Sequence, residues 1–538
     1  MATASKDASS AVAPARIVGQ ASTAAPTRYA WYVLLLLTAA NTFNYIDRKI
    51  LSILAEAIKA DLGIDDAQIG FLFGTVFAAL YAIFGLPIGR LADNWSRTRL
   101  MALGLTLWSG MTALSGFAGN FLHLSLARVG VSAGEAVANP CSHSLIADYF
   151  PAHRRATAYA TYLTGSFVGM GLSLAIGGVV MQGWPSFAAD VGLQWLRPWQ
   201  AAFLICGLPG LVLALLVFRM VEPQRGALDG LPARPTVAKP WRALPVDIAS
   251  VLPPFSFARM ARMSPRALRI NLIGAALLSF TAWFMLRLTG DVEQWIASAL
   301  AAYAIMSFAQ AIHHGDLPLF RLTFGSRAFQ LLAAGMAVTA CINTALLFWA
   351  PPHMLRHFGL SEAQAGLTLG LIIAGSTAVG VIGGGMIVDR IRRRDVRAAI
   401  WAAFFGLLGP APMAAMMFLA DDLGSFYIGL IGFCLLQNSW SGGAAAILQE
   451  LVLPRMRATG SASFSMLIIV ASLSLGPYAA GKISTLTGSL STGALSLYVL
   501  APVGVLLLWA AARRLPDAVA GKVARAEAAQ AEMDRARA

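Results

Sequence analysis

Five polar residues, Asn41, Asn44, Tyr45, Asp47 and Arg48, interrupt the first long apolar run of the chain. The run extends from about residue 31 to 58, which is long enough to cross a bilayer as a tilted helix. A charged residue at the centre of such a helix costs roughly 3 kcal/mol on insertion scales unless it faces a protein interior or a water-filled cavity. We therefore expect these charges to face a cavity within a helical bundle. A structural ion pair is the alternative, and one pair can serve both roles.

The spacing of these residues supports a cavity-facing stripe. Asn41, Asn44, Tyr45, Arg48 and Ser52 follow the i, i+3, i+4, i+7, i+11 pattern of one helical face, with the adjacent carboxylate on its flank. We expect this face to line the substrate path.

The composition requires a multi-spanning membrane protein. Of the 538 residues, 57% are hydrophobic and 12% are charged, and the mean hydropathy is +0.67, which is too apolar for a soluble domain. The net charge of +14 comes from basic residues in the N-terminal segment, alternate loops and the C-terminal tail, as the positive-inside rule requires. We expect a multi-pass protein of the cell inner (cytoplasmic) membrane, with both termini cytoplasmic and no nucleic-acid partner.

The cysteines indicate neither disulfides nor a metal site. Cys141, Cys206, Cys341 and Cys434 lie singly in apolar runs, without a CxxC or Cys/His spacing. Residues 1–29 contain no apolar segment ahead of a cleavage site, so we expect the first helix to be retained as an uncleaved anchor. No cofactor is indicated.

The order of apolar runs divides the chain into six predicted segments. Six runs lie at about 31–58, 67–91, 100–118, 121–147, 156–182 and 199–219, two at 270–287 and 294–312, and six at 328–350, 366–388, 398–420, 423–448, 457–482 and 492–512. The predicted segments are 1–29, a cytoplasmic N-terminal segment; 30–220, a six-helix bundle; 221–269, a basic cytoplasmic linker; 270–327, an inserted two-helix hairpin and connector; 328–515, a second six-helix bundle; and 516–538, a cytoplasmic tail. This gives fourteen transmembrane helices in an all-α membrane protein.

Two of these segments carry further expectations. The linker has Phe255, Phe257, Met260 and Met263 between basic residues, which fits either a short helix on the membrane surface or a disordered connection. The hairpin shows no polar stripe comparable to that of the first helix, so we expect it to pack outside the bundles and to be peripheral to transport.

The two six-run halves look like one unit repeated. Gly385 and Asp389, followed by arginines, echo Gly89 and Asp93 with an offset of 389 − 93 = 296 residues. The same offset carries the start of the first half, residue 31, to residue 327, where the second half begins.

The turn with Gly89, Asp93, Arg97 and Arg99 resembles the signature of the major facilitator superfamily. The resemblance implies two six-helix bundles related by pseudo-two-fold symmetry, a substrate site near the midplane between them, and alternating access. It also implies a conformational latch formed by Asp93, Arg97 and Asp389.

Narrower motifs resemble the spinster-like transporters of lysolipids and sphingolipids. They are Asn44 to Arg48, Arg128 to Ala136, Leu145 to Pro151, and Phe348 to Pro352. The first motif is shared with the organic anion:cation symporters of sugar acids and sialic acid. The hairpin departs from this plan and resembles the extra helix pair of some peptide transporters.

Candidate functional residues follow from the intramembrane polar groups. In the fourth run, Arg128 and Glu135 lie two turns apart on one face, which Asn139 and His143 continue. The alternative is that the intramembrane arginines and carboxylates only neutralise one another, and His143 fits a hydrogen-bonded interior histidine better than a proton relay. We predict proton coupling through Asp47 and Glu135. The predicted substrate-binding residues are Arg48, Arg128, Asn44, Tyr45, Asn139, Tyr162, Trp349, Gln437 and Asn438.

The distribution of charge indicates the kind of substrate. The charges deep in the spans fall in the first half, whereas the second half carries charges only near the ends of its spans. A cavity charged on one wall and apolar on the other suits an amphiphile whose anionic head meets Arg48.

We therefore predict a proton-coupled transporter of an anionic lipid, a lysophospholipid or a sphingoid phosphate, acting as a monomer. A proton-coupled symporter of small organic anions is the alternative. An enzyme is not indicated, because the sequence has no phosphate loop, HExxH or G-x-S-x-G motif in context. A sensor that has lost transport would need a soluble domain, and the linker is too short for one.

Overall fold

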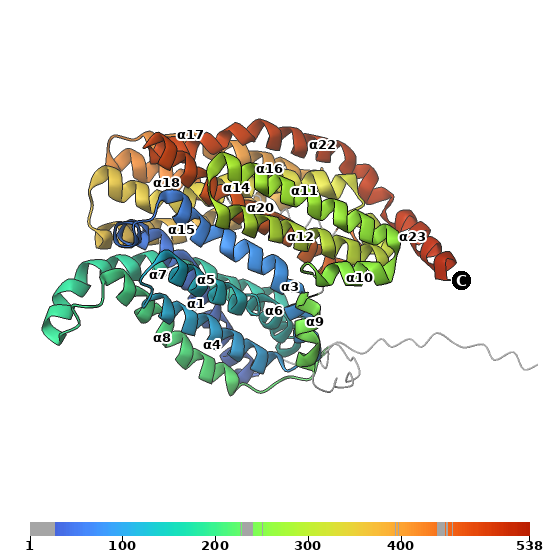
Figure 1. Cartoon of the computed structure of the whole chain (residues 1–538), viewed down its shortest axis with the longest axis horizontal. Helices are drawn as coiled ribbons and strands as arrows, with labels where there is room; N and C mark the ends of the chain where they lie inside the picture. The colour runs from blue at the N-terminus through green and yellow to red at the C-terminus, as the bar shows by residue number, and fades with distance from the viewer. Residues whose placement is uncertain are drawn as a thin grey trace, which may run out of the picture.

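The computed structural model describes residues 27–225, 228, 240–249, 251–392, 394–395, 397–437, 439, 447, 450–453 and 456–537, and the regular structure of this part is helical (Figure 1). The first half comprises α1 (Arg28–Leu62), α2 (Asp66–Gly70), the π-helical η1 (Phe71–Thr75), α3 (Val76–Asn94), α4 (Arg97–Ser115), α5 (Phe121–Glu135), α6 (Ala138–Tyr149), α7 (Ala152–Val191) and α8 (Pro198–Phe218). Between the halves lie η3 (Pro240–Arg242), α9 (Ala243–Ala249), α10 (Phe255–Met263), α11 (Pro265–Thr289), α12 (Val292–Gly315) and α13 (Leu317–Leu322). The second half comprises α14 (Arg327–Phe358), α15 (Glu362–Arg392), α16 (Ala398–Leu408), α17 (Pro410–Leu419), α18 (Leu423–Gln437), α20 (Arg457–Thr487), α21 (Leu490–Ser496), η5 (Leu497–Leu500), α22 (Ala501–Ala520) and α23 (Lys522–Arg537).

Within the described residues, ten helical segments are long and apolar enough to cross a membrane. They include α11 and α12 of the hairpin, but α1, α4 and α5 are not among them. In α1 and α5 the apolar sequence is interrupted by the polar groups singled out above. These helices therefore need protein neighbours, since intramembrane charges are tolerated only where they face protein or water.

Several of the predicted runs are not single α-helices. The run expected at 398–420 is divided into α16 and α17, and the run expected at 492–512 contains the 3₁₀ turn η5. The run expected at 121–147 breaks after Glu135, because Pro140 lacks an N–H and its ring would clash with the carbonyl of residue 136 in a continuous helix. The run expected at 67–91 contains the π-helical turn η1. Such turns are often found at functional sites. Residues 255–263 of the linker do form a helix, α10, in which Ser256 and Met260 are buried.

Close helix crossings use glycine. A Cβ at Gly165 or Gly169 of α7 would lie 2.5 Å from a backbone carbonyl oxygen of α1, and one at Gly171 would lie 2.7 Å from the carbonyl oxygen of Gly370 on α15. Helix α7 therefore packs closely against α1 of its own half and α15 of the other. Small residues at helix interfaces are how membrane helices gain close backbone contact.

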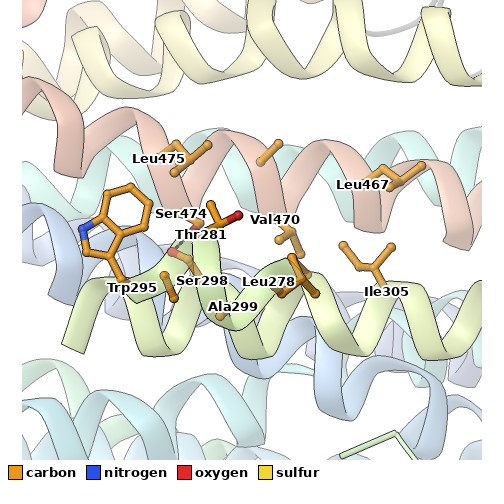
Figure 2. A pocket seen from close by; sticks show the side chains of 13 residues that line it. Leu278, Thr281, Trp295, Ser298, Ala299, Ile305, Leu467, Val470, Ser474 and Leu475 are labelled. Carbon is orange, nitrogen blue, oxygen red and sulfur yellow. Dashed lines mark hydrogen bonds between the residues drawn. The ribbon is translucent and has the colours of Figure 1, made fainter. Parts of the chain in front are cut away.

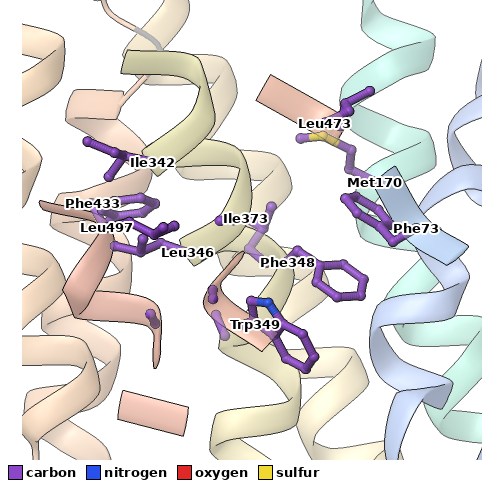
Figure 3. Packing of buried hydrophobic residues seen from close by; sticks show 14 of the residues in the cluster. Phe73, Met170, Ile342, Leu346, Phe348, Trp349, Ile373, Phe433, Leu473 and Leu497 are labelled. Carbon is purple, nitrogen blue, oxygen red and sulfur yellow. The ribbon is translucent and has the colours of Figure 1, made fainter. Parts of the chain in front are cut away.

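The largest apolar cluster joins the two halves. The rings of Phe73 from η1 and Phe348 from α14 stack with centroids 4.0 Å apart, and Trp349 packs edge-on against Phe348 (Figure 3). Beside them, Ser52 of α1 donates a hydrogen bond to the Phe348 carbonyl oxygen at 2.5 Å. The halves therefore touch through aromatic side chains near this region of α14.

A charged cluster joins the halves at the end of the molecule where α1 and α14 finish. Arg356 of α14 donates to both carboxylate oxygens of Asp66, at 2.8 and 2.6 Å, and to Glu56 of α1 at 2.6 Å. Lys59 pairs with the same Asp66, and Ser484 of α20 donates to it at 2.7 Å. We call this cluster the closed end.

Local sequence places Asp66 in that cluster. Gly63 ends α1 with a positive φ of 64°, a conformation that favours glycine. Asp65 then caps α2 through a capping box with Gln68, at 2.8 and 3.1 Å. The tight connection brings Asp66 to the first turn of α2, facing the second half.

The hairpin is bonded to both halves through polar residues at one end of α12, and its peripheral role stays a prediction. Gln294 of α12 accepts a hydrogen bond from Thr75 at 2.6 Å and donates to the Ser474 carbonyl at 2.7 Å. One turn earlier, Asp291 pairs with Lys482 at 2.7 Å. These residues have the helical spacing i, i+3, and Figure 1 shows the hairpin beside α20.

Arg97, expected in the latch, lies buried in contacts within the first half. It pairs with Asp148 and with Glu222, whose carboxylate lies 2.8 Å from Nε. Burial alone would raise the pKa of Glu222, but hydrogen bonds from the Thr98 backbone and from Arg97 hold this pKa below its ordinary value. The side chains of Asp93 and Asp389 lie outside the described residues, so a latch of these three residues stays a prediction.

We predict that Glu222→Gln lowers thermal stability at pH 7 by about 1–2 kcal/mol, because it removes charged hydrogen bonds to a buried arginine. A carboxylate whose pKa is depressed in the folded state stabilises the fold above its unfolded pKa of about 4.3, and this contribution disappears as pH falls through the folded pKa. The difference between variant and wild type should therefore shrink below about pH 4. Thermal unfolding of the protein in detergent, repeated across pH, measures the loss of stability at pH 7 and its decrease at low pH.

The matched control for that experiment is Glu532→Gln. Glu532 pairs with Arg321 at 3.0 Å, but both side chains are more than half exposed. Exposed pairs contribute little, so this variant should match wild type at every pH. An equal loss in both variants would contradict the account of Glu222.

We predict that Arg356→Met weakens the closed end, since the variant loses hydrogen bonds from Arg356 to two carboxylates of the other half. Spin labels at Ala60 of α1 and Gln364 of α15, both exposed, would report the separation of the halves by pulsed electron resonance. The population with the longer distance should grow in Arg356→Met and not in Arg321→Met, whose arginine pairs with Glu532 of the C-terminal helix α23. Identical distance distributions in wild type and Arg356→Met would contradict the assignment.

Candidate functional site

The intramembrane charges of α1 and α5 lie together. Arg128 of α5 donates from Nη1 to the backbone carbonyl of Asp47 at 2.9 Å. Asp47, Arg128 and Glu135 are 0%, 3% and 5% exposed. Three groups that are charged in water are thus enclosed where the two helices meet.

The two carboxylates form no ion pair in the described part of the chain, and their polar neighbours are Thr112 beside Asp47 and Asn44 beside Glu135. Neither oxygen of Asp47 or of Glu135 accepts a hydrogen bond there, and neither group lies within 4.0 Å of a described basic nitrogen. Both arginines of the site act electrostatically on Glu135 without touching it. Asp47 and Glu135 therefore do not form, in this state, the structural ion pairs that would hold α1 and α5 together.

Arg48 lies in an aromatic environment. Its guanidinium carbon lies 3.9 Å from the centre of the Phe77 ring of α3, and its buried Nε has no hydrogen-bond partner among the described residues. A cation over a ring face is favourable, but it leaves the planar N–H donors available. The N–H donors of Arg48 are thus not used by the described residues.

A chain of amides and hydroxyls extends the site. Asn41 donates to the Tyr162 carbonyl at 3.0 Å and to Ser166 at 2.9 Å, and the Tyr162 hydroxyl donates to Asn139 at 3.3 Å. These contacts connect α1, α7 and α6. On α1, Asn44 is buried and Tyr45 is half-buried.

The predicted second-half residues are placed differently. Trp349 is fully buried and donates to the Pro477 carbonyl at 3.0 Å, so it belongs to the packing between α14 and α20. Gln437 is buried, and its side-chain nitrogen has no described partner. Asn438 lies outside the described residues. The structure thus gathers the first-half candidates but does not bring Trp349 to them.

Two features of the site were not predicted. Lys49 follows Arg48 directly, and its ammonium lies 4.9 Å from the centre of the Phe73 ring. The sequence signal that could have identified Lys49 is its position as a third charged residue directly after Asp47 and Arg48. The pairing of Arg356 with Asp66 joins residues 290 positions apart, and no local pattern indicates it.

Within the described residues, no group of three or more His, Cys, Asp or Glu side chains is arranged to hold a metal ion. The four cysteines are buried free thiols. The titratable groups that the site brings together are therefore the carboxylates Asp47 and Glu135 and the guanidinium groups Arg48 and Arg128.

The sequence model of the Major Facilitator Superfamily matches residues 37–342, and that of the Organic Anion Transporter Polypeptide (OATP) family matches residues 307–423. An MFS-type efflux pump of Mycolicibacterium smegmatis is 27% identical over 498 residues, which cover 90% of this chain and 94% of the pump. Protein spinster homolog 1 of Homo sapiens is 27% identical over 471 residues, covering 84% of this chain and 72% of that protein.

The solved structures agree with this resemblance. A bacterial homolog of the human lysosomal transporter Spinster, in an inward-facing and unoccupied conformation, is similar with a TM-score of 0.63 and 25% identity, over 94% of this chain and 96% of that chain. The resemblance to spinster-like transporters is thereby confirmed. The chain belongs to the major facilitator superfamily, as a multi-pass membrane transporter with spinster-like relatives over most of its length, and is not an enzyme.

Proposed function

We propose that this transporter couples protons to the movement of an amphiphilic anionic lipid, a lysophospholipid or a sphingoid phosphate, by alternating access. The observation that carries the proposal is the pair of buried carboxylates without an ion pair, Asp47 and Glu135, beside Arg48 and Arg128. A buried carboxyl without an ion pair is favoured in its neutral, protonated form, whereas a nearby arginine favours the charged form. Small changes in hydration or occupancy can therefore load or release a proton.

The coupling follows from competition for positive charge. An anionic head group at Arg48 satisfies the guanidinium and removes its attraction for Glu135, which favours protonation of that carboxyl. Loss of the proton restores a negative charge that competes with the head group for the arginine. Substrate and proton therefore act on each other through the same charge, as linkage requires.

The apolar second half supports a lipid tail. Phe348 of α14 and Ile373 of α15 belong to the large apolar cluster on the side that meets Phe73 and Met170 of the first half (Figure 3). Such a wall binds a hydrocarbon chain through the hydrophobic effect. This arrangement would hold the anionic head group of the lipid in the first half and its hydrocarbon tail against the second half.

A small organic anion is the second candidate. The match of residues 307–423 to the organic anion transporter model favours it. A small anion would use the same arginines without the apolar wall, so affinity that is independent of chain length would support this alternative.

The membrane arrangement is part of the proposal. We infer fourteen spans, because α1, α4, the broken α5–α6 segment and α18 are added to the ten apolar segments. We propose that the protein lies in the inner membrane. By the positive-inside rule both termini are then cytoplasmic, and the closed end faces outward. We propose that the protein acts as a monomer.

We predict that Asp47→Asn and Glu135→Gln retain substrate binding but lose pH-driven transport, because each variant mimics permanent protonation. The measurement is uptake of a labelled lysolipid into proteoliposomes with and without an imposed pH gradient. Asp61→Asn is the control, since that carboxylate pairs with Arg197 near the closed end, away from the site. Unchanged pH dependence in both site variants would refute coupling at these residues.

We predict that Arg48→Lys weakens binding of an anionic lipid and that Arg48→Ala nearly abolishes it. The guanidinium offers a planar fork for a phosphate or carboxylate, whereas an ammonium is a point charge. Ligand-induced thermal stabilisation of the purified protein measures the affinity. Normal affinity in a folded Arg48→Ala protein would point to Arg128 or to a neutral substrate.

A further inference from the structure

Lys49 is an intramembrane cation for which the described residues provide no counter-charge. It lies on α1 directly after Arg48, and no ion pair or hydrogen bond joins its ammonium to the described part of the chain. Its near neighbour is the face of Phe73. A cation–π contact offsets only part of the cost of removing an ammonium from water. A charge kept in such a place is by default a functional group.

The position of Lys49 differs from that of Arg48. Arg48 lies over Phe77 of α3, within the first half. Lys49 lines a small cavity between the halves, together with Ser52 of α1, Met170 of α7, Phe348 of α14 and Ile373 of α15. Two consecutive cations therefore face different aromatic rings, and Lys49 borders the other half.

The cavity beside Lys49 is closed by a contact between the halves. Ser52, one turn further along α1, donates to the Phe348 carbonyl, and Phe348 stacks on the same Phe73 ring that Lys49 faces. The space measures about 20 Å³, which is room for one water molecule. A phosphate or carboxylate would fit beside the ammonium only if α14 moved away from α1.

We propose that Lys49 is a second anion contact, which an anionic ligand at Arg48 reaches when α14 separates from α1. The inference rests on the proposed function because it requires an anionic ligand. It does not require that this ligand be a lipid. A ligand that gains a contact only in the separated state shifts the equilibrium toward that state by its differential affinity. Lys49 thus links occupancy of the first-half site to the relative position of the halves.

The test compares Lys49→Met and Lys49→Arg with wild type, and uses Lys522→Met of the C-terminal helix α23 as the control. Lysophosphatidic acid and the uncharged monoacylglycerol with the same chain are the probes, with thermal stabilisation as the readout. We expect Lys49→Met to weaken lysophosphatidic acid binding at least about tenfold, as loss of a charged hydrogen bond implies. Lys49→Arg should keep most of the affinity, and binding of monoacylglycerol should not change.

A second readout separates a ligand contact from a structural role. In wild type carrying spin labels at Ala60 and Gln364, lysophosphatidic acid should increase the population with the longer distance, and this response should be lost in Lys49→Met. Without ligand, Lys49→Met should be at least as stable as wild type, because an apolar chain of similar length replaces an uncompensated charge. A lower unfolding temperature in the unliganded variant would show that Lys49 is structural and would overturn the inference.

The outcomes also distinguish this inference from the proposed function. If lysophosphatidic acid does not stabilise wild type, the lipid substrate is wrong, and galactonate, a small anion, replaces it in the same comparison. If either anion stabilises wild type and Lys49→Met binds it equally well, the inference is wrong while anion transport stands. If neither anion stabilises wild type, the proposed function and the inference about Lys49 are both wrong.

Discussion

Burial of charged groups that form no direct ion pair in the first half is the constraint on which the rest of the structure depends. Asp47, Arg128 and Glu135 are almost wholly enclosed, yet the described contacts leave both carboxylates without hydrogen bonds. Such groups are expensive in a membrane, so the helices around them must exclude lipid and control the access of water. Glycines of α7 permit this by bringing α1 within backbone contact. The packing of the first half is therefore a consequence of the charges that it holds.

The second constraint is that the halves must separate. They are held at the closed end by Arg356 with Asp66, and further inward by Ser52 with Phe348. These two polar contacts are confined to a few side chains, so they can break without unfolding either half. The stacking of Phe73 on Phe348 and the close approach of α7 to α15 complete the interface. The hairpin adds another polar contact, because Gln294 bonds to both Thr75 and Ser474. The hairpin, which lies outside the two bundles, thus bridges the two halves in this conformation.

The hairpin also forms an apolar groove with α20. Leu278 of α11, Ile305 of α12 and Leu467 of α20 line it, and the hydroxyls of Ser298 and Ser474 within it bond to each other at 2.8 Å (Figure 2). Since these two hydroxyls are mutually satisfied, the surface between the hairpin and the second half is chiefly apolar. The polar bonds near Gln294 therefore lie at one end of a predominantly apolar interface.

The sequence predicted the elements that repeat with a helical period and missed those that depend on distant contacts. Asn41, Asn44 and Ser52 of the predicted stripe are buried, because polar residues in an apolar run have few places to lie. That this stripe lines a cavity stays a prediction. The break after Glu135 could have been read from Pro140, whose effect on a helix is local. By contrast, the fully packed position of Trp349 is set by α20, far along the chain. Tertiary contacts of this kind leave no periodic signal.

Proton movement driven by substrate is the most direct measure of the central claim. Wild-type protein would be placed in liposomes that contain a pH-sensitive dye, at equal pH on both sides and with the membrane potential clamped. A gradient of lysophosphatidic acid would then be imposed, with protein-free liposomes as the reference. If the buried carboxylates exchange protons as an anion occupies the arginines, reciprocity requires the lipid gradient to change the internal pH in proportion to lipid transported. Lipid transport with no pH change beyond that of protein-free liposomes would contradict the account.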